Sequence, residues 1–216
     1  MPTTACERIT PIIHVIDDDE SFRTAIERLL RAVGYTVRSY SSGGEFLGSP
    51  GAVGPGCVLV DMLMPDHSGL DIQQMLTQRG EGLPIIFISG HATVPATVRA
   101  MQSGAVDFLT KPIQKEGLLR TISLALVRDA EARAIQENVS KTRLFYQTLT
   151  TRQRSVFQGV VMGKLNKQMA AELGVAERTI KAHRAQVMKK MHVDSIAGLV
   201  HLALHLQDGS APSIHP

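Results

Sequence analysis

Short apolar segments alternate with amphipathic helical stretches along the front half of the chain. Apolar segments of strand length occupy 11–16, 36–40, 57–61, 84–89 and 106–110. Helical spacing of apolar residues marks 20–33, 69–78 and 95–102, a short helix surrounds Glu45 and Phe46, and another helix begins at Gln114. Strands that alternate with helices pair in parallel. The pattern therefore predicts an α/β fold with a doubly wound five-stranded parallel sheet, whose ligands bind at the carboxyl ends of the strands.

Beyond Leu149 the sequence carries only helical patterns. Thr150 and Gln153 have the spacing of a capping box, which opens a helix that runs toward Met162. Further helices are predicted at 166–173, 177–191 and 195–206, with Gly163 and Gly174 marking the turns before the first two of them. This part of the chain is therefore expected to be an all-α domain of four helices.

Charged and small residues dominate the segment 129–146 between these two parts. It is either a helical extension of the preceding helix, which its alanine content favours, or a mobile linker. We expect an α/β domain at 10–128, a helical linker at 129–146, a helical domain at 147–206 and a flexible tail at 207–216.

Composition excludes several classes of protein. No apolar run approaches the roughly 18 residues that span a bilayer, and the N-terminal residues lack the apolar region of a secretory signal. Cys6 and Cys57 have neither metal-ligand spacing nor a disulfide framework, which suits a reducing cytosol. The chain has no tryptophan and few aromatic residues, which argues against base stacking with single strands. We therefore expect a cytoplasmic protein without membrane contact.

Charge is distributed unevenly along the chain. Residues 1–140 hold 12 Lys and Arg against 16 Asp and Glu, a net charge of −4. Residues 141–216 hold 11 Lys and Arg against 4 Asp and Glu, a net charge of +7, which gives +3 for the whole chain. The basic part suggests nucleic acid as its partner, because cationic proteins release counterions when they bind DNA. A chance asymmetry of solvated faces is the alternative.

Polar side chains follow the predicted strands at the points where these strands end. Asp17 and Asp18 follow the first strand, Asp61 ends the third, Ser89 ends the fourth and Lys111 follows the fifth. Parallel strands bring all five residues to one edge of the sheet. Clustered carboxylates repel one another unless a hard cation such as Mg²⁺ joins them, and a lysine and a hydroxyl can hold phosphoryl oxygens. Asp61 would then be a nucleophile that forms an aspartyl phosphate, although an Asp-Asp pair alone is also a common helix cap.

Four motifs around these residues resemble those of bacterial response-regulator receiver domains. They are Val15-Ile16-Asp17-Asp18-Asp19-Glu20, Val60-Asp61-Met62-Leu63-Met64-Pro65, Ser89-Gly90-His91 and Asp107-Phe108-Leu109-Thr110-Lys111-Pro112. The resemblance implies a CheY-like fold in which Asp17 and Asp18 hold Mg²⁺ with Asp61, the acceptor of phosphoryl from a sensor histidine kinase. It also implies supporting roles: the backbone carbonyl of Leu63 as a metal ligand, Ser89 and Phe108 as switch residues, Lys111 as the phosphate-binding lysine, and a cis bond before Pro112.

The predicted helix 177–191 has one apolar and one cationic face. At 100° per residue, Val187 and Met191 fall within about 20° of Ile180. The residues on the opposite side are basic or small: Arg178, Lys181, Ala182, Ala185 and Lys189. Small residues allow close approach to a DNA groove, and lysine or arginine reaches phosphates or guanine edges. Arg184 lies near the inward edge, from which it can extend to a phosphate or pair with an acid.

The back half also resembles a known family, the four-helix output domain of LuxR-type regulators. The similar segments are Leu149-Thr150-Thr151-Arg152-Gln153, Gly163-Lys164-Leu165-Asn166-Lys167-Gln168-Met169-Ala170 and Thr179-Ile180-Lys181-Ala182-His183-Arg184. The resemblance implies that Lys181, Ala182 and Ala185 read bases, and that Asn166, Lys167 and Thr179 contact phosphates. Ala176 departs from it, since a serine usually caps this helix. With the receiver, the chain resembles the NarL/FixJ response regulators, and His183-Arg184-Ala185 favours the FixJ branch.

These resemblances imply a transcriptional regulator of a two-component system. Phosphorylation of Asp61 would promote homodimerisation and binding to double-stranded promoter DNA, with RNA polymerase as a further partner, and the chain would catalyse only its own phosphorylation and dephosphorylation. Two alternatives are a phosphatase of the haloacid dehalogenase class and a DNA binder independent of phosphorylation. The first expects an aspartate two residues after the nucleophile, where Leu63 stands.

Overall fold

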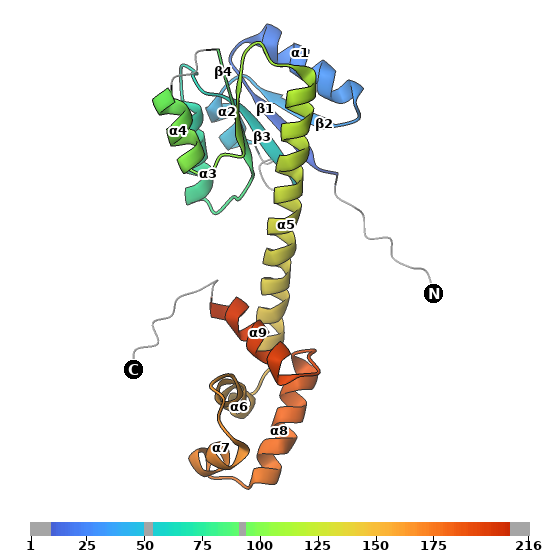
Figure 1. The fold of residues 1–216 in the computed structure, drawn as a ribbon, viewed down its shortest axis with the longest axis vertical. Coiled ribbons are helices and arrows are strands. Elements are labelled where there is room, and N and C mark those ends of the chain that lie inside the picture. Colours follow the sequence, from blue (N-terminus) through green and yellow to red (C-terminus); the bar gives the residue numbers. More distant parts are fainter. Residues whose placement is uncertain (1–9, 50–53, 91–93, 208–216) are drawn as a thin grey trace, which may run out of the picture. The chain divides into compact units, whose positions relative to one another are not determined.

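The computed structural model describes residues 10–49, 54–90 and 94–207, and the chain divides into two compact units, 1–133 and 134–216 (Figure 1). The expected tail at 207–216 lies outside the described residues except for Gln207. Among the described residues, none of the helices combines the length and the apolar character that a bilayer crossing requires.

The first unit is built on a parallel sheet. Its described strands are β1 (Ile12–Ile16), β2 (Thr36–Tyr40), β3 (Gly56–Asp61), β4 (Ile85–Ser89) and β5 (Asp107–Thr110), in the order β2-β1-β3-β4-β5. All neighbouring pairs are parallel. The order reverses between β1 and β3, so the carboxyl ends of these two strands flank the position at which doubly wound folds bind their ligands. The predicted fold class is confirmed.

Helices cover both faces of this sheet. They are α1 (Glu20–Ala32), α2 (Gly43–Gly48), α3 (Gly69–Gln78), α4 (Val94–Gln102) and α5 (Lys115–Gln147). Successive residues of β3 point to opposite faces, as strand geometry requires. Val58 and Val60 pack in a cluster with residues of α2, α3 and α4, whereas Cys57 and Leu59 pack in a second cluster with residues of α1 and α5.

The helix α5 continues without a break through the segment 129–146. Asp129 is 3% exposed, and its carboxylate accepts a hydrogen bond of 2.9 Å from the backbone N–H of Gly56. The Nε of Arg133 donates to both oxygens of that carboxylate, at 2.9 and 2.8 Å, and the guanidinium also donates to the carbonyl of Gly54. These contacts hold α5 against the start of β3, and the first unit therefore extends to Arg133.

The second unit is helical. Beyond α5, the described residues form α6 (Thr151–Val161), α7 (Asn166–Leu173), α8 (Glu177–Lys190) and α9 (Ile196–Gln207). The predicted capping box is present, since the hydroxyl of Thr150 accepts from the N–H of Gln153 while the Gln153 side chain accepts from the N–H of Thr150. Gly174 ends α7 with a φ of +64°, a conformation that glycine adopts without strain.

A buried histidine in β1 makes the stability of the first unit depend on pH. His14 is 1% exposed and shares a 3.1 Å hydrogen bond with the Tyr40 hydroxyl. Burial, with the positive charge of Arg38 adding to it, lowers the pKa of His14 from 6.5 to about 4. Below pH 6.5 the unfolded chain should therefore bind a proton that the folded state excludes, and the free energy of unfolding should fall by about 3 kcal/mol as the pH decreases toward 4.

The variant His14→Gln tests this expectation, because glutamine keeps a polar group beside Tyr40 but does not titrate. Urea unfolding at pH 7 and pH 5 should show a smaller loss of stability for the variant than for the wild type. If both proteins lose stability in parallel, His14 is not the source of the pH dependence.

Candidate functional site

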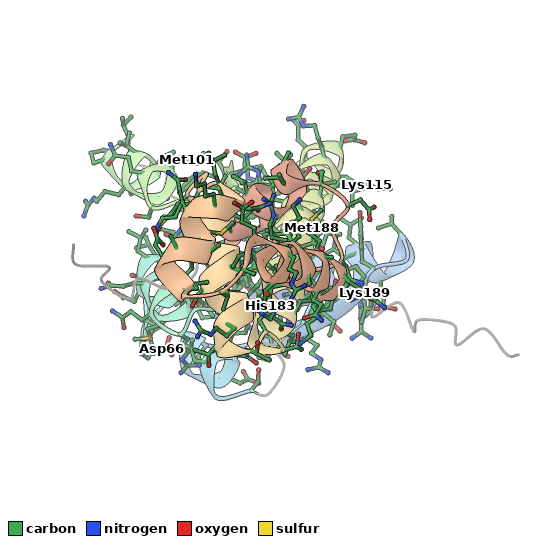
Figure 2. All side chains as sticks on the ribbon, turned by 90° about the horizontal axis from the view of Figure 1, so that it is seen from below. Asp66, Met101, Lys115, His183, Met188 and Lys189 are labelled. Atoms are coloured by element: carbon green, nitrogen blue, oxygen red, sulfur yellow. The ribbon has the colours of Figure 1, made fainter. Side chains whose placement is uncertain are left out.

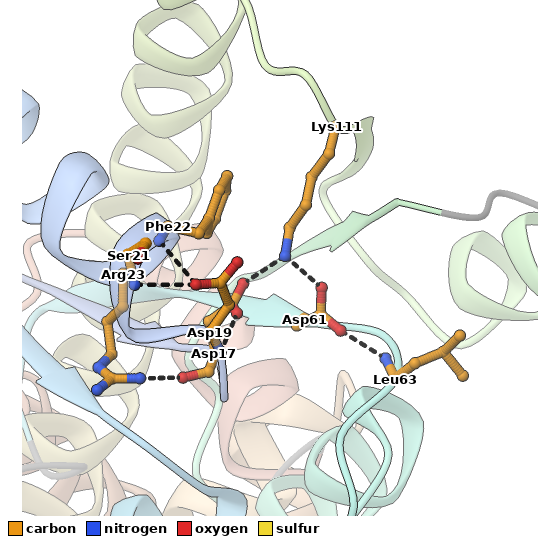
Figure 3. Close-up of polar contacts among 8 residues, drawn as sticks. All are labelled: Asp17, Asp19, Ser21, Phe22, Arg23, Asp61, Leu63 and Lys111. Atoms are coloured by element: carbon orange, nitrogen blue, oxygen red, sulfur yellow. Dashed lines mark hydrogen bonds and ion pairs between the residues drawn. The ribbon is translucent and has the colours of Figure 1, made fainter.

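Two carboxylates and one ammonium group meet at the carboxyl edge of the sheet (Figure 3). Asp17 follows β1, Asp61 ends β3 and Lys111 follows β5. The Nζ of Lys111 lies 2.7 Å from Oδ2 of Asp17 and 2.9 Å from Oδ1 of Asp61. Asp17 is 1% exposed and Asp61 is 6% exposed, so both carboxylates lie beneath the surface with the lysine as their counterion.

Backbone groups hold the two carboxylates in place. The N–H of Leu63 donates to Oδ2 of Asp61 at 2.8 Å, and the N–H of Asp19 donates to Oδ1 of Asp17 at 2.9 Å. The backbone N–H of Lys111 donates to the carbonyl of Ser89 at 2.8 Å, which sets where the lysine leaves the sheet. The Lys111–Pro112 bond is cis, as the receiver resemblance implied.

The other predicted residues of the pocket differ in exposure. Ser89 is 1% exposed at the end of β4, Phe108 in β5 is half-buried, and the side chain of Asp18 is exposed. The Leu63 side chain is 63% exposed. The structure thus brings Asp17 and Asp61 into direct contact with Lys111, whereas Ser89, Phe108 and Asp18 are placed only by their positions in or next to the strands.

Sequence reasoning missed three residues of α1 and its cap. Asp19 caps α1, since its Oδ1 accepts from the N–H groups of Ser21 at 2.9 Å and Phe22 at 3.2 Å. The Nη1 of Arg23 donates to the carbonyl of Asp17 at 2.6 Å. Aspartate before a helix is a recognisable cap signal, but the contacts of Phe22 and Arg23 depend on the rotation of the helix about its axis.

Electrostatics of the pocket favour a cation between the carboxylates. Burial raises the pKa of Asp17, although hydrogen bonds from Lys111 and Asp19 oppose that rise. Burial works to lower the pKa of Lys111, but hydrogen bonds and charge from Asp17 and Asp61 outweigh it and raise that pKa. The ammonium is therefore charged at neutral pH, and it partly neutralises a pocket that would otherwise hold two close negative charges.

The donor set also suits a divalent cation that keeps part of its water shell. Among the described residues, no group of three or more His, Cys, Asp or Glu side chains is arranged to hold a metal ion. Mg²⁺ does not need such a cage, because it is usually bound through one or two carboxylates together with water and phosphate oxygens. Asp17 and Asp61, which already share one cation, supply two carboxylates of this kind.

In the second unit, α8 has the two faces that the sequence predicted. Ile180 and Val187 are 0% exposed and Met191 is 1% exposed, so the apolar stripe faces the core. The side chains on the outer face are exposed: Arg178, Lys181, Ala182, Ala185 and Lys189, the last of them labelled with its neighbour Met188 in Figure 2. The outer face is therefore cationic, with alanines that leave room for close approach.

One side chain at the edge of this face is bonded to the neighbouring helix α7. The Nη1 of Arg184 donates to Oδ1 of Asn166 at 2.6 Å, which joins α8 to the start of α7. From the sequence we expected Arg184 to contact a phosphate or an acidic side chain, whereas in the structure it contacts the neutral side-chain amide of Asn166. Lys167 is exposed beside Asn166, and Thr179 is half-buried in the first turn of α8.

Comparison with known families matches both units. Residues 13–123 match the family described as "Response regulator receiver domain", and residues 147–203 match "Bacterial regulatory proteins, luxR family". The chain belongs to the response regulators of two-component systems. It is a response regulator with a LuxR-type DNA-binding domain. Its family consists of DNA-binding regulators and not of classical enzymes, which removes the haloacid dehalogenase alternative.

Similar proteins share both domains with this response regulator. It is 41% identical over 197 residues to the response regulator protein TmoT of Ectopseudomonas mendocina, covering 91% of this chain and 90% of that protein. It is 36% identical over 192 residues to the transcriptional regulatory protein FixJ of Rhizobium meliloti, covering 89% and 94%. Among solved structures, the response regulator StyR matches with a TM-score of 0.79 and 40% identity, covering 90% of this chain and 98% of that chain. The predicted FixJ-like family is confirmed.

The helix α8 of this response regulator begins without a side-chain cap. Ala176 has the extended backbone of an N-cap, with φ −74° and ψ 150°, but no side-chain oxygen accepts from the first turn of α8. Ala176→Ser supplies that acceptor and should stabilise α8 by about 1 kcal/mol. Hydrogen exchange of the Arg178 and Thr179 amides should slow accordingly, whereas Ala176→Val, which has no acceptor, should not slow it. Equal exchange in all three proteins would show that the cap is unimportant here.

Proposed function

We propose that Asp61 accepts a phosphoryl group from a sensor histidine kinase, and that phosphorylation promotes homodimerisation and promoter binding. The observation that supports this assignment is the Lys111 ammonium, which contacts both Asp17 and Asp61 at the strand ends. We assign the receiver to 10–128 and the output domain to 147–206, joined by the linker at 129–146. Because bacterial DNA and RNA polymerase lie in the cytoplasm, we place the protein there, in contact with the polymerase at its promoters.

The receiver residues have separate roles in this proposal. Asp17, Asp18, Asp61 and the backbone carbonyl of Leu63 would hold Mg²⁺, which supplies positive charge to neutralise the transferred group. A carboxylate oxygen of Asp61 attacks the phosphorus, and the leaving group departs with its electron pair.

Other side chains would respond to the new phosphoryl group. The Lys111 ammonium and the Ser89 hydroxyl donate hydrogen bonds to its oxygens. Ser89 and Phe108 are the residues through which the change reaches the surface of α4 and β5, where the receivers would meet in the dimer.

The output domain would bind DNA through α8 and the start of α7. Lys181, Ala182 and Ala185 face bases in the major groove, because they lie on the exposed side of α8. The surrounding residues approach the phosphates: Asn166, Lys167, Arg178, Thr179, Arg184 and Lys189. A dimer would place two such helices about one DNA turn apart.

Affinity for DNA in the two phosphorylation states tests the proposal. The DNA is a site selected from a random library with the activated protein. Beryllofluoride with Mg²⁺ mimics the phosphoryl group on the aspartate and should tighten binding to this site at fixed salt concentration. Equal affinity with and without beryllofluoride would instead support the alternative of phosphorylation-independent binding.

Leu63, two residues after Asp61, should control how long the phosphoryl group persists. The aspartyl phosphate is lost when water attacks the phosphorus in line, and Leu63 cannot hydrogen-bond such a water. Leu63→Asn should therefore accelerate dephosphorylation by about tenfold, equivalent to about 1.4 kcal/mol of activation free energy. The substitution should not destabilise the core, because the Leu63 side chain is 63% exposed.

Phosphate release from the isolated phosphoprotein measures this effect. Leu63→Ala is the control, since it removes the bulk but adds no hydrogen-bonding group. Acceleration by alanine as large as that by asparagine would mean that Leu63 only crowds the water. His91, two residues after Ser89, is a polar residue that could orient the water in place of Leu63, and it lies outside the described residues. It controls the water if His91→Ala slows release while Leu63→Asn changes little.

A further inference from the structure

The Lys111 ammonium has a third neighbour besides the two carboxylates. Its Nζ lies 4.0 Å from the centroid of the Phe22 ring. Phe22 belongs to the first turn of α1 and is half-buried (Figure 3). The ammonium is therefore bounded by Asp17, by Asp61 and by the face of an aromatic ring.

Local hydrogen bonds fix the position of this ring. The carboxylate of Asp19 accepts from the backbone N–H of Phe22 at 3.2 Å, which sets the start of α1. The next residue, Arg23, donates to the carbonyl of Asp17 at 2.6 Å and ties the same turn to the end of β1. Phe22 also packs against the apolar cluster that α1 and α5 share. The ring and the backbone of Asp17 are therefore held by one connected set of contacts.

An aromatic ring acts on an ammonium differently from a carboxylate. The face of the ring carries partial negative charge and attracts a cation within about 6 Å of its centroid. It does not take up an N–H of the ammonium as strongly as a carboxylate does, so those hydrogens remain for anionic oxygens. The ring also covers one side of the ammonium against water, which strengthens the attraction to the remaining partners.

We propose that Phe22 is a positioning residue for phosphoryl transfer, which holds the Lys111 ammonium between Asp17 and Asp61 so that it meets the incoming phosphoryl oxygens. This inference rests on the proposed function of Asp61 and Lys111. With an acyl phosphate as donor, an Asp61 carboxylate oxygen forms the new bond to phosphorus and the bond from phosphorus to the acyl oxygen breaks. The carboxylate of the donor leaves with the electron pair, and Lys111 remains protonated throughout.

Autophosphorylation with acetyl phosphate and Mg²⁺ tests the role of the ring. Phe22→Leu keeps an apolar side chain but removes the aromatic face, and it should slow the reaction by about fivefold, the rate equivalent of a contact of about 1 kcal/mol. Phe22→Tyr retains the face and should recover most of the rate. The fraction of phosphorylated protein is measured over time by intact-protein mass spectrometry and on a phosphate-affinity gel.

A series of fluorinated phenylalanines at position 22 separates electrostatics from packing. Fluorine withdraws charge from the ring face with little change in shape, so the rate should fall stepwise with each added fluorine while the free energy of unfolding stays constant. Leu29→Ala is the matched structural control, because Leu29 lies on the same helix and packs against the same cluster as Phe22. A rate that does not change along the fluorine series would overturn the proposal.

A double-mutant cycle with Lys111→Met identifies the partner of the ring. Phe22→Leu should have no further effect on the rate when the ammonium is already absent. An equal slowing in both backgrounds would also overturn the proposal. Phosphoryl uptake by Asp61→Asn as fast as by the wild type would refute the proposed function itself, whereas uptake that requires Asp61 but is indifferent to Phe22 refutes only the role of the ring.

Discussion

Asp61→Asn should abolish the dimerisation that a phosphodonor induces in the wild-type protein. Asparagine occupies nearly the same volume as aspartate and can still accept the 2.8 Å hydrogen bond from the N–H of Leu63. It lacks the carboxylate nucleophile, so no aspartyl phosphate forms and the receiver surface does not change. Sedimentation velocity of both proteins, each with acetyl phosphate and Mg²⁺, should show a shift toward dimer only for the wild type.

Asp66→Asn is the matched control for this experiment. Asp66 lies in the same loop after β3, at the surface, and accepts a 3.1 Å hydrogen bond from the N–H of Gly44. That hydrogen bond, together with one from His67, lowers the pKa of Asp66. Its carboxylate is therefore charged at neutral pH, so Asp66→Asn removes one negative charge from the same loop. This variant should still dimerise with the phosphodonor. Equal dimerisation of Asp61→Asn and the wild type would refute the assignment of the phosphorylation site.

The sheet and its functional edge were predictable because both follow from strand order. Apolar segments of strand length that alternate with helices leave few arrangements open, and parallel strands place their carboxyl ends together. This rule brought Asp17, Asp61 and Lys111 to one edge, where the structure finds them in contact. The first and last residues of the elements shift by about one position, as cap geometry commonly causes.

Contacts that depend on how one helix lies against another element were not predictable. Phe22 reaches Lys111 only because α1 is rotated by its cap and by the hydrogen bond of Arg23, and periodicity does not specify that rotation. Arg184 meets Asn166 across the crossing of α7 and α8. Likewise, Asp129 looks like a solvated charge in an alanine-rich linker, but it is buried because it accepts the N–H of Gly56 at the start of β3.

The buried and exposed faces of α8, in contrast, were predictable, because a rotation of 100° per residue was sufficient to tell them apart. Ile180 and Val187 are fully buried, as predicted from their angles. A single helix has one rotational degree of freedom, and a continuous apolar stripe determines it. The exposed residues opposite that stripe, Lys181 among them, are therefore the residues on which a base-reading role can be tested.

Lys181→Ala should weaken binding to the specific DNA site by about 1–3 kcal/mol, if this lysine reads a base in the major groove. The side chain is exposed, so its removal leaves the core of the helical domain intact. Affinity for random DNA should change less, because the phosphate contacts remain. Fluorescence anisotropy with the selected site and with a random duplex, for the activated protein at one salt concentration, measures the two losses.

Lys167→Ala is the comparison that separates base reading from phosphate contact. Lys167 is exposed in the first turn of α7, beside Asn166, where a cation approaches the DNA backbone. Its removal should weaken both duplexes alike and reduce the slope of log affinity against log salt by about 1, because one fewer phosphate is neutralised. Lys181→Ala should instead lower the ratio of specific to random affinity. If Lys181→Ala weakens both duplexes equally, as Lys167→Ala does, then Lys181 contacts phosphate and the base-reading surface of α8 lies nearer Ala182 and Ala185.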